Sequence, residues 1–382
     1  MKELNIYFDY NATTPTDPRV VEAILPYFNS DFGNPSSLHI LGQKIKNAVE
    51  RSRSQISGFF NAESSEIIFT SGATEAINLA LKGIAETNYY KGKHVITTQT
   101  EHSAVLNVCK YLEKKGFEID YLQVDNDGLI DINEFADKIR DDTILVSVIF
   151  VNNETGVIQP IEEIGDICKN HNVFFFTDAT QAVGKTPIDV NKLNVDLLCF
   201  SGHKFYGPKG IGGLYCRKDV NIEPLIHGGG HERGLRSGTL NVTGIVGLAK
   251  AFEIAHSEMS PTQEKIKTLR NKFENELLET KIIKINGHPT QRLFNVSNIC
   301  ITNMDPFLVQ NELSNVAYSR GSACNSSSVK PSHVLKAMGY SDKEVLESFR
   351  FSFGKYNTMA EINVVIEKLK KLFETKSLLN KV

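Results

Sequence analysis

The sequence has no long apolar stretch and no apolar leader at its start. No window comes close to about 18 uninterrupted apolar residues, so we expect no membrane-spanning helix. Residues 1–10 contain Lys2, Glu3 and Asp9 and show no apolar centre of the kind found in a signal peptide. Both absences predict a cytoplasmic protein that has no membrane partner.

The sequence also lacks an excess of one charge and any cysteine spacing typical of a metal site. The chain carries 42 Lys and Arg against 45 Asp and Glu, a net charge of −3, which argues against direct binding of nucleic acid. Its six cysteines form no CxxC pair and no zinc-ligand spacing, and a chain of 382 residues is far too long to depend on disulfides. We therefore expect neither a metal site nor a disulfide framework.

What the sequence does contain is a regular alternation of short, β-branched apolar runs with helical patterns. This order predicts an α/β fold with a mainly parallel, seven-stranded sheet covered by helices. Near residue 256 the pattern changes, so we expect a large domain over residues 16–256 and a smaller α+β domain from residues 1–15 and 257–382. The expected strands are 66–70, 94–98, 118–122, 143–151, 173–178, 197–201 and 212–216, with helices at 38–59, 74–88, 104–115, 161–171, 242–256 and 256–279.

Two polar residues follow expected strands at points where ligands bind in α/β sheets. Lys204 comes directly after the strand 197–201 and the turn that begins there. Desolvation at such a place lowers the pKa of an amine and lets it form a Schiff base with an aldehyde cofactor, the alternative being an ordinary turn lysine. Asp178 ends the strand 173–178, where a carboxylate would keep a pyridine nitrogen protonated or would cap the following turn.

Two further connections suit an anionic, flat ligand. The small residues Ser71 to Thr74 open a helix, whose free N–H groups and dipole favour a phosphate, although many strand-to-helix turns look the same. His102 follows the strand 94–98, where it would stack on a flat ring or move protons, or would simply lie in a loop.

One cysteine differs from the others in its surroundings. Cys324 lies among small polar residues from Gly321 to Ser328, a composition typical of a mobile, exposed loop. A thiol there can be attacked and can travel, and Arg320 and Lys330 would favour its thiolate; the alternative is an idle surface thiol. We expect the remaining cysteines to be small core residues: Cys109, Cys168, Cys199, Cys216 and Cys300.

Taken together, these segments closely resemble the pyridoxal-phosphate (PLP) dependent cysteine desulfurases of the NifS/IscS type. The resemblance runs in order from about residue 7 to residue 355. It rests on DYNATTP at residues 9–15, TSGATE at 70–75, TEH at 100–102, VNNETG at 151–156, DATQ at 178–181, SGHKFYGPKG at 201–210, HGGGHER at 227–233, RSGT at 236–239 and the loop around Cys324.

The resemblance implies an enzyme of PLP fold type I that converts L-cysteine to L-alanine. Lys204 would be the Schiff-base lysine and would also remove the Cα proton, while His102 would stack over the ring and shuttle protons. The Cys324 thiolate would take the substrate sulfur as a persulfide. Arg350, with Asn153 and Asn11 nearby, would bind the substrate carboxylate. The other implied cofactor contacts are Asp178 at the pyridine nitrogen, Gln181 and Asn153 at the ring hydroxyl, and Ala73, Thr74, Ser201, His203 and Thr239 at the phosphate.

The resemblance also implies partners. Because Thr239 would reach in from a second subunit, a homodimer is expected. The persulfide would pass to a sulfur-acceptor protein of unknown identity, in iron–sulfur cluster assembly, DNA phosphorothioation or tRNA thiolation. Arg320 replaces a small residue that is usual there, and the sequence stops at Val382 without the longer tail of housekeeping members, which favours a specialised use.

Three other interpretations are open at this point. A selenocysteine lyase would share most of the motifs, and activity on the two amino acids would separate it. A class V aminotransferase needs no thiol on a mobile loop, so Cys324 argues against it. A scaffold that keeps PLP only for folding would have no need for Lys204, His102, Arg350 and Cys324 together.

Overall fold

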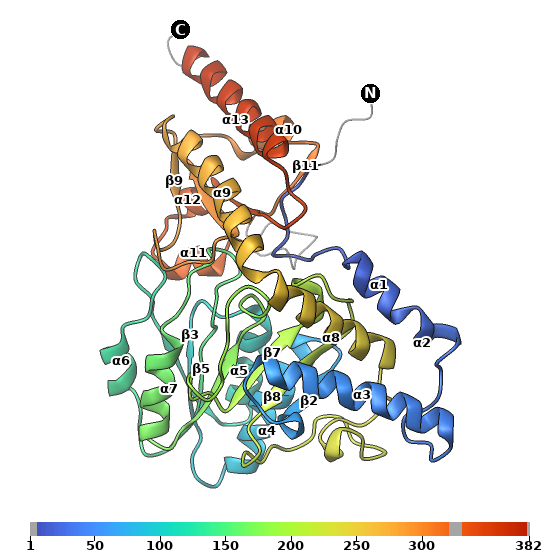
Figure 1. Cartoon of the computed structure of the whole chain (residues 1–382). Coiled ribbons are helices and arrows are strands. Elements are labelled where there is room, and N and C mark those ends of the chain that lie inside the picture. The colour runs from blue at the N-terminus through green and yellow to red at the C-terminus, as the bar shows by residue number, and fades with distance from the viewer. Residues whose placement is uncertain (1–5, 321–330, 380–382) are drawn as a thin grey trace.

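The structure is a computed structural model that describes residues 6–320 and 331–379, and its main body is a seven-stranded sheet (Figure 1). Only β8 runs antiparallel to its neighbours, so the predicted mainly parallel sheet is confirmed. Across the sheet the order is β2 (Ile67–Thr70), β8 (Gly212–Cys216), β7 (Leu197–Ser201), β6 (Phe174–Asp178), β5 (Thr143–Ser147), β3 (His94–Thr98) and β4 (Glu118–Leu122).

Helices cover both faces of this sheet (Figure 1). Successive strand residues point to opposite faces, and in β6 Phe175 and Phe176 accordingly belong to two different buried clusters. Both faces are thus dry, which explains why these strands read as continuous apolar runs. The Phe175 cluster includes side chains of α3 (Ile40–Phe59), α7 (Ile161–Asn170) and α8 (Val242–Ser257), and the Phe176 cluster those of α4 (Ala73–Asn88) and α5 (Ser103–Lys114).

The C-terminal part forms smaller sheets with the N-terminal segment. The strand β1 (Ile6–Tyr7) pairs in parallel with β11 (Val316–Ala317), more than 300 residues later in the chain. The predicted division at residues 15 and 256 stays a prediction, although the sheets separate near those points. The other elements here are β9 (Ile283–Ile285), β10 (Val296–Ile301), β12 (Ser348–Ser352), α9 (Met259–Leu278), α10 (Pro306–Glu312), α11 (His333–Ala337), α12 (Asp342–Leu346) and α13 (Met359–Leu379).

The expected strand 143–151 is too long. The strand β5 ends at Ser147, and the chain then leaves the sheet. The amides of Val148 and Phe150 still donate to the backbone oxygens of Phe176 and Asp178 in β6. Val151 instead makes an isolated bridge with Ile158, so residues 152–157 form a turn beyond the carboxyl end of β5. Apolar side chains in this turn are buried like strand residues, which is why their pattern does not reveal the strand end.

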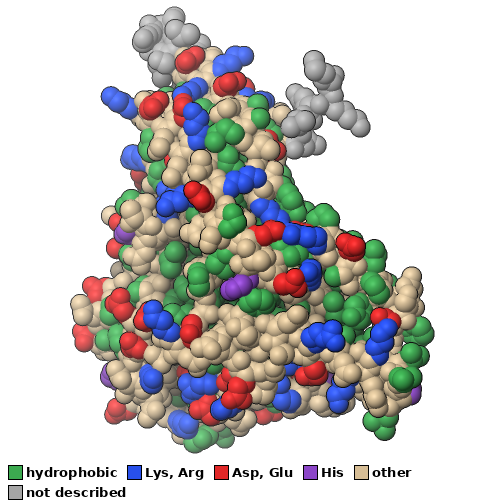
Figure 2. Space-filling model, in the orientation of Figure 1, with side chains coloured by type: hydrophobic (Ala, Val, Ile, Leu, Met, Phe, Trp, Pro, Cys, Tyr) green, Lys and Arg blue, Asp and Glu red, His purple; other side chains and the backbone are tan. Residues whose placement is uncertain are grey.

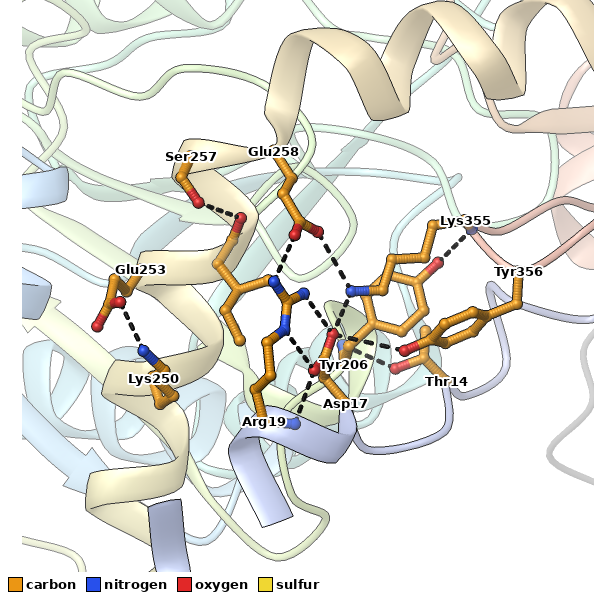
Figure 3. A network of polar contacts seen from close by, with 11 residues as sticks. Thr14, Asp17, Arg19, Tyr206, Lys250, Glu253, Ser257, Glu258, Lys355 and Tyr356 are labelled. Atoms are coloured by element: carbon orange, nitrogen blue, oxygen red, sulfur yellow. Dashed lines mark hydrogen bonds and ion pairs between the residues drawn. The ribbon is translucent and has the colours of Figure 1, made fainter. Parts of the chain in front are cut away.

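A network of charged side chains joins three distant segments (Figure 3). Asp17 begins α1 (Pro18–Ile24) and is paired with Arg19 at 2.9 Å and with Lys355 at 2.5 Å. Glu258, between α8 and α9, pairs with the same two cations at 2.6 and 3.5 Å. Hydrogen bonds from Arg19 hold the pKa of Asp17 well below its usual range, and Lys355 lowers it further. The network ties the N-terminal segment, which continues into α2 (Pro26–Asn29), to the end of β12.

The remaining helix of the large sheet region is α6 (Ile132–Asp137). In the part of the chain that the structure describes, we find no helix that is both long and apolar enough to cross a membrane.

Candidate active site

A cavity of about 590 Å³ lies at the carboxyl ends of the parallel strands, where sheets of this kind bind ligands. It collects residues that are far apart in the sequence, from the N-terminal segment to β12. Eleven of the predicted site residues line it: Asn11, Ala73, Thr74, His102, Asn153, Asp178, Gln181, Ser201, His203, Lys204 and Arg350.

Lys204 lies on a short 3-10 turn, Gly202–Lys204, directly after β7. Its Nζ donates to the backbone oxygens of Asn11 at 2.7 Å and of Ala12 at 2.8 Å. The turn closes through the Gly207 amide, which donates to the Gly202 oxygen. This amine therefore lies after a buried strand and at a cavity, while its role as a Schiff-base lysine stays a prediction.

Asp178 is buried at the end of β6 and presents a carboxylate to the cavity. Its Oδ1 accepts from the Thr180 amide at 2.9 Å, so it also caps the following turn, and from the Cys199 thiol at 3.3 Å. Sequence reasoning placed Cys199 in the core and missed this contact. The pairing of Asp178 with Cys199 between β6 and β7 brings the two side chains together.

A second carboxyl group, Glu101, is completely buried near Asp178. Burial, reinforced by the negative charge of Asp178, raises the pKa of Glu101 well above its usual value. Its Oε1 accepts from the Ile149 amide at 2.6 Å. Burial thus favours the neutral form of the Glu101 carboxyl group.

His102 begins α5, and its Nδ1 accepts the Ala104 amide at 3.2 Å. A neutral imidazole that accepts at Nδ1 carries its proton on Nε2. The helix cap thus selects the tautomer and fixes the ring at the cavity wall.

The N-terminus of α4 suits a phosphate. Gly72 is its N-cap and supplies no side-chain cap, so the first N–H groups of a 16-residue helix lack that partner. The φ of Gly72 is 154°, which favours glycine, whereas a Cβ there would make only an ordinary contact, at 3.5 Å, with the Ser201 Oγ. Burial, together with the charge of Lys204, lowers the pKa of His203 to about 4, and Thr13 Oγ1 lies 3.0 Å from its Nδ1.

Arg350 on β12 forms the opposite wall and is only 3% exposed. Its Nη2 pairs with Asp9 Oδ1 at 2.8 Å, and its Nη1 donates to the Asn153 oxygen at 3.1 Å. Its buried Nε has no hydrogen-bond partner among the described residues. A guanidinium held in this way has a donor to offer to an anionic ligand.

Asn11 and Gln181 connect the two walls. The Asn11 side chain donates to the Asn153 oxygen at 3.0 Å and accepts from Asn295 at 2.9 Å, so it is already engaged within the protein. Gln181 Nε2 donates to the Asn11 oxygen at 3.0 Å, and Lys185 donates to Gln181 Oε1 at 3.1 Å. The sequence pattern gave no signal for Lys185.

Two predicted residues are not part of this cavity as described. Cys324 lies outside the described residues, but the chain on either side of its segment is anchored at the cavity. Ser319 exchanges backbone hydrogen bonds with Arg350, and His333, which lines the cavity, bonds to the Glu101 oxygen at 2.9 Å. Thr239 is exposed and is not among the described residues that line the cavity of its own chain.

The other cysteines are all buried, as predicted. Burial raises the pKa of Cys109 and of Cys216 to about 12, and that of Cys300 to about 11. These thiols therefore stay protonated near neutrality and are poor nucleophiles. The Arg320 guanidinium lies 5.6 Å from the Phe349 ring and donates to the Leu346 oxygen, while its expected effect on the Cys324 thiol stays a prediction.

Comparison with known proteins gives concordant matches over nearly the whole length. The family model for class-V aminotransferases matches residues 6–365. A cysteine desulfurase IscS from Methanosarcina thermophila is 49% identical over 364 residues, covering 95% of this chain and 90% of that protein. A NifS-like protein of known structure has a TM-score of 0.91 at 40% identity and covers 98% of this chain and 100% of its own. A structure described as SspA in complex with cysteine has a TM-score of 0.83 at 40% identity, covering 92% and 100%.

Proposed function

The chain belongs to the class-V aminotransferase family and is a PLP-dependent cysteine desulfurase, and from this premise we propose a role for each residue of its cavity. The observation that carries the assignment of roles is the meeting of Lys204, Asp178 and Arg350 around one cavity. These three groups are an amine, a buried carboxylate and a buried guanidinium, and they come from separate elements.

The residues present fit PLP. When bound, this cofactor supplies an aldehyde for an amine and a protonated ring that withdraws electrons. Lys204 would hold the aldehyde carbon and Asp178 the pyridine nitrogen, while His102 would lie against the ring. Gln181 and Asn153 would contact the ring hydroxyl. The phosphate ligands would be the Ala73 amide, Thr74, Ser201 and His203 at the uncapped start of α4.

The substrate L-cysteine, with which the related SspA was solved, would be oriented by its carboxylate on Arg350. Arg350 lines the cavity and uses two of its five N–H donors on Asp9 and Asn153, which supports this role. Asn153 and Asn11 line the same wall, although the Asn11 side chain contributes by holding Asn153. Lys204, as a free amine, would then accept the Cα proton, and His102 Nε2 would carry protons to and from the substrate.

The Cys324 thiolate would attack the substrate sulfur. A sulfur–sulfur bond forms, the carbon–sulfur bond breaks, and the carbon skeleton keeps the electron pair and takes up a proton to become alanine. Cys324 comes five positions after Ser319, a span that reaches at most about 18 Å when extended. Because Ser319 is bonded to Arg350, this span is long enough for the thiol to reach the place where the substrate carboxylate would bind.

We also propose that the active unit is a homodimer in which Thr239 contacts the phosphate in the second copy's cavity. The segment around Thr239 is linked to the chain after α2, because the Gly238 amide donates to His231 Nδ1 and His231 Nε2 lies 3.4 Å from Ser36 Oγ. Figure 2 shows hydrophobic side chains at the edge of the molecule over α1 and α2. The exposed apolar residues of this region are Leu25, Phe28, Phe32, Leu38, Ile40 and Leu41. A second copy would cover them, whereas the sulfur acceptor remains to be identified by experiment.

The test is the absorbance of the purified protein before and after L-cysteine is added, with alanine measured in parallel. We expect a Schiff-base band that changes with cysteine and disappears in Lys204→Ala. Lys209→Ala is the matched control, since Lys209 also lines the cavity but follows no strand. A Lys204→Ala protein that keeps the band and the alanine yield would refute the assigned role of Lys204.

A further inference from the structure

A second lysine, Lys185, contacts a residue of the cofactor cavity without lining that cavity itself. Lys185 follows the turn that Asp178 caps, and its Nζ donates both to the backbone oxygen and to the side-chain Oε1 of Gln181, each at 3.1 Å. Lys185 and Lys204 line the same small adjoining cavity, whereas only Lys204 also lines the large one. Lys185 therefore cannot serve as a first contact of a ligand in the large cavity, but it contacts a residue that can.

The hydrogen bonds of Gln181 leave its amide only one orientation. Its Oε1 accepts from Lys185, and its Nε2 donates to the Asn11 oxygen, which is also the acceptor of the Lys204 amine. A flipped amide would place two donors, Lys185 Nζ and Gln181 Nε2, against each other. The remaining proton on Nε2 is thus the group that Gln181 can offer to an oxygen in the cavity.

No carboxylate among the described residues that line the small cavity is free to form an ion pair with Lys185. The carboxylate that lines the same small cavity is Glu258, and it is already paired with Arg19 and Lys355 (Figure 3). Tyr10 and Tyr206, which line it as well, stay neutral because burial raises the pKa of both phenols. Lys204 also lines the large cavity. The other titratable or charged residues that line that cavity are Glu75, His102, Glu154, Asp178, His203, Lys209, His333 and Arg350. Burial, and after it the charge of Lys204, lowers the pKa of Lys185 to about 7.

We propose that Lys185 is a positioning residue that locks Gln181 as a hydrogen-bond donor to the ring hydroxyl of the cofactor and places a second amine beside the nitrogen of Lys204. The inference rests on the roles proposed above for Lys204 and Gln181. A donor at the ring hydroxyl oxygen withdraws electron density from it, and a nearby cation disfavours a positive charge on the Lys204 nitrogen. Both effects make that nitrogen release its proton at lower pH.

The experiment is a pH titration of the absorbance of the cofactor-loaded protein without substrate, which reports the protonation of the Lys204 nitrogen. In Lys185→Met we expect the midpoint of the titration to move upward by about one pH unit. Lys185→Arg, which keeps a cationic donor, should restore the midpoint. The matched control is Lys368→Met, which removes a similar lysine-to-carbonyl bond, to the Glu312 oxygen at 3.0 Å, in the C-terminal part.

A double substitution tests whether Lys185 acts through Gln181. If it does, Gln181→Leu alone should raise the midpoint, and the combination with Lys185→Met should shift it by less than the sum of the two. An unmoved midpoint in folded Lys185→Met, a fully additive double variant, or an equal shift in Lys185→Arg would each overturn the inference while leaving the desulfurase assignment intact. A wild-type protein with cofactor bound but without any titration would instead refute the role of Lys204 itself.

Discussion

Replacing Arg350 by lysine keeps a positive charge in the cavity but removes the planar fork. Arg350 uses one donor of Nη2 on Asp9 and one donor of Nη1 on the Asn153 oxygen, so further N–H groups of its fork are left for the substrate carboxylate. A lysine that keeps the bond to Asp9 has fewer directed donors for the substrate. A hydrogen bond between charged groups contributes about 1.5–3 kcal/mol, and losing one of about 2 kcal/mol lowers kcat/KM roughly thirtyfold.

The assay is alanine formation at varied L-cysteine, with a matched control in the same protein. Arg292→Lys alters another buried fork, since Arg292 pairs with Glu274 at 2.6 Å and its side chain is 5% exposed, but it lies outside the cavity. We expect Arg292→Lys to change the unfolding midpoint and to leave kcat/KM within about twofold, because it removes no contact with substrate. Equal losses of kcat/KM in the two variants, or no loss in Arg350→Lys, would show that Arg350 does not bind the carboxylate.

Three further substitutions test other parts of the molecule. Cys324→Ser should abolish both alanine formation in the absence of added thiol and the persulfide detected by mass spectrometry, whereas Cys109→Ser, a change at a buried thiol, should retain both. Cys199→Ala removes a hydrogen bond to the Asp178 carboxylate and should lower kcat about fivefold, while Cys199→Ser keeps a donor and should stay near the wild-type rate. Asp17→Asn breaks a buried pair and should lower the free energy of unfolding by about 3 kcal/mol at neutral pH. Because pairing depresses the pKa of Asp17, its contribution is present above the unfolded value of about 4 and is lost as the pH falls, so urea unfolding curves of the two proteins should converge in acid.

Strand positions could be predicted from the sequence because both faces of the sheet are buried. The runs 94–98, 118–122, 197–201 and 212–216 match β3, β4, β7 and β8 residue for residue, since turn residues bound each of them. The expected helix 256–279 instead begins at Met259, because Glu258 interrupts it with the φ and ψ of a cap. The charged residues near Glu258 favour a helix in the sequence pattern. The ion pair of Glu258 with Arg19 is a tertiary contact, which that pattern does not reveal.

The residues that the sequence did not reveal act through partners that are distant in the chain. Lys185 matters through Gln181, Cys199 through Asp178, and His333 through the Glu101 oxygen. Each of these residue types is common and carries no local pattern of its own. A cysteine inside a buried strand in particular reads as a packing residue until the neighbouring strand is known.

The N-terminal segment determines how the amine and the guanidinium face each other. Asn11 supplies one oxygen to Lys204, and its side chain holds the Asn153 oxygen that Arg350 also contacts. Asp9, two residues earlier, pairs with the same guanidinium. Lys204 follows a strand of the large sheet and Arg350 lies on a strand of a smaller sheet, and this short segment contacts both side chains. In the proposed arrangement, a substrate whose carboxylate rests on Arg350 would have its Cα beside Lys204 only while the segment keeps its position. Displacing the segment would therefore reduce the rate of proton removal as well as substrate binding, because both groups would move relative to the same substrate atom.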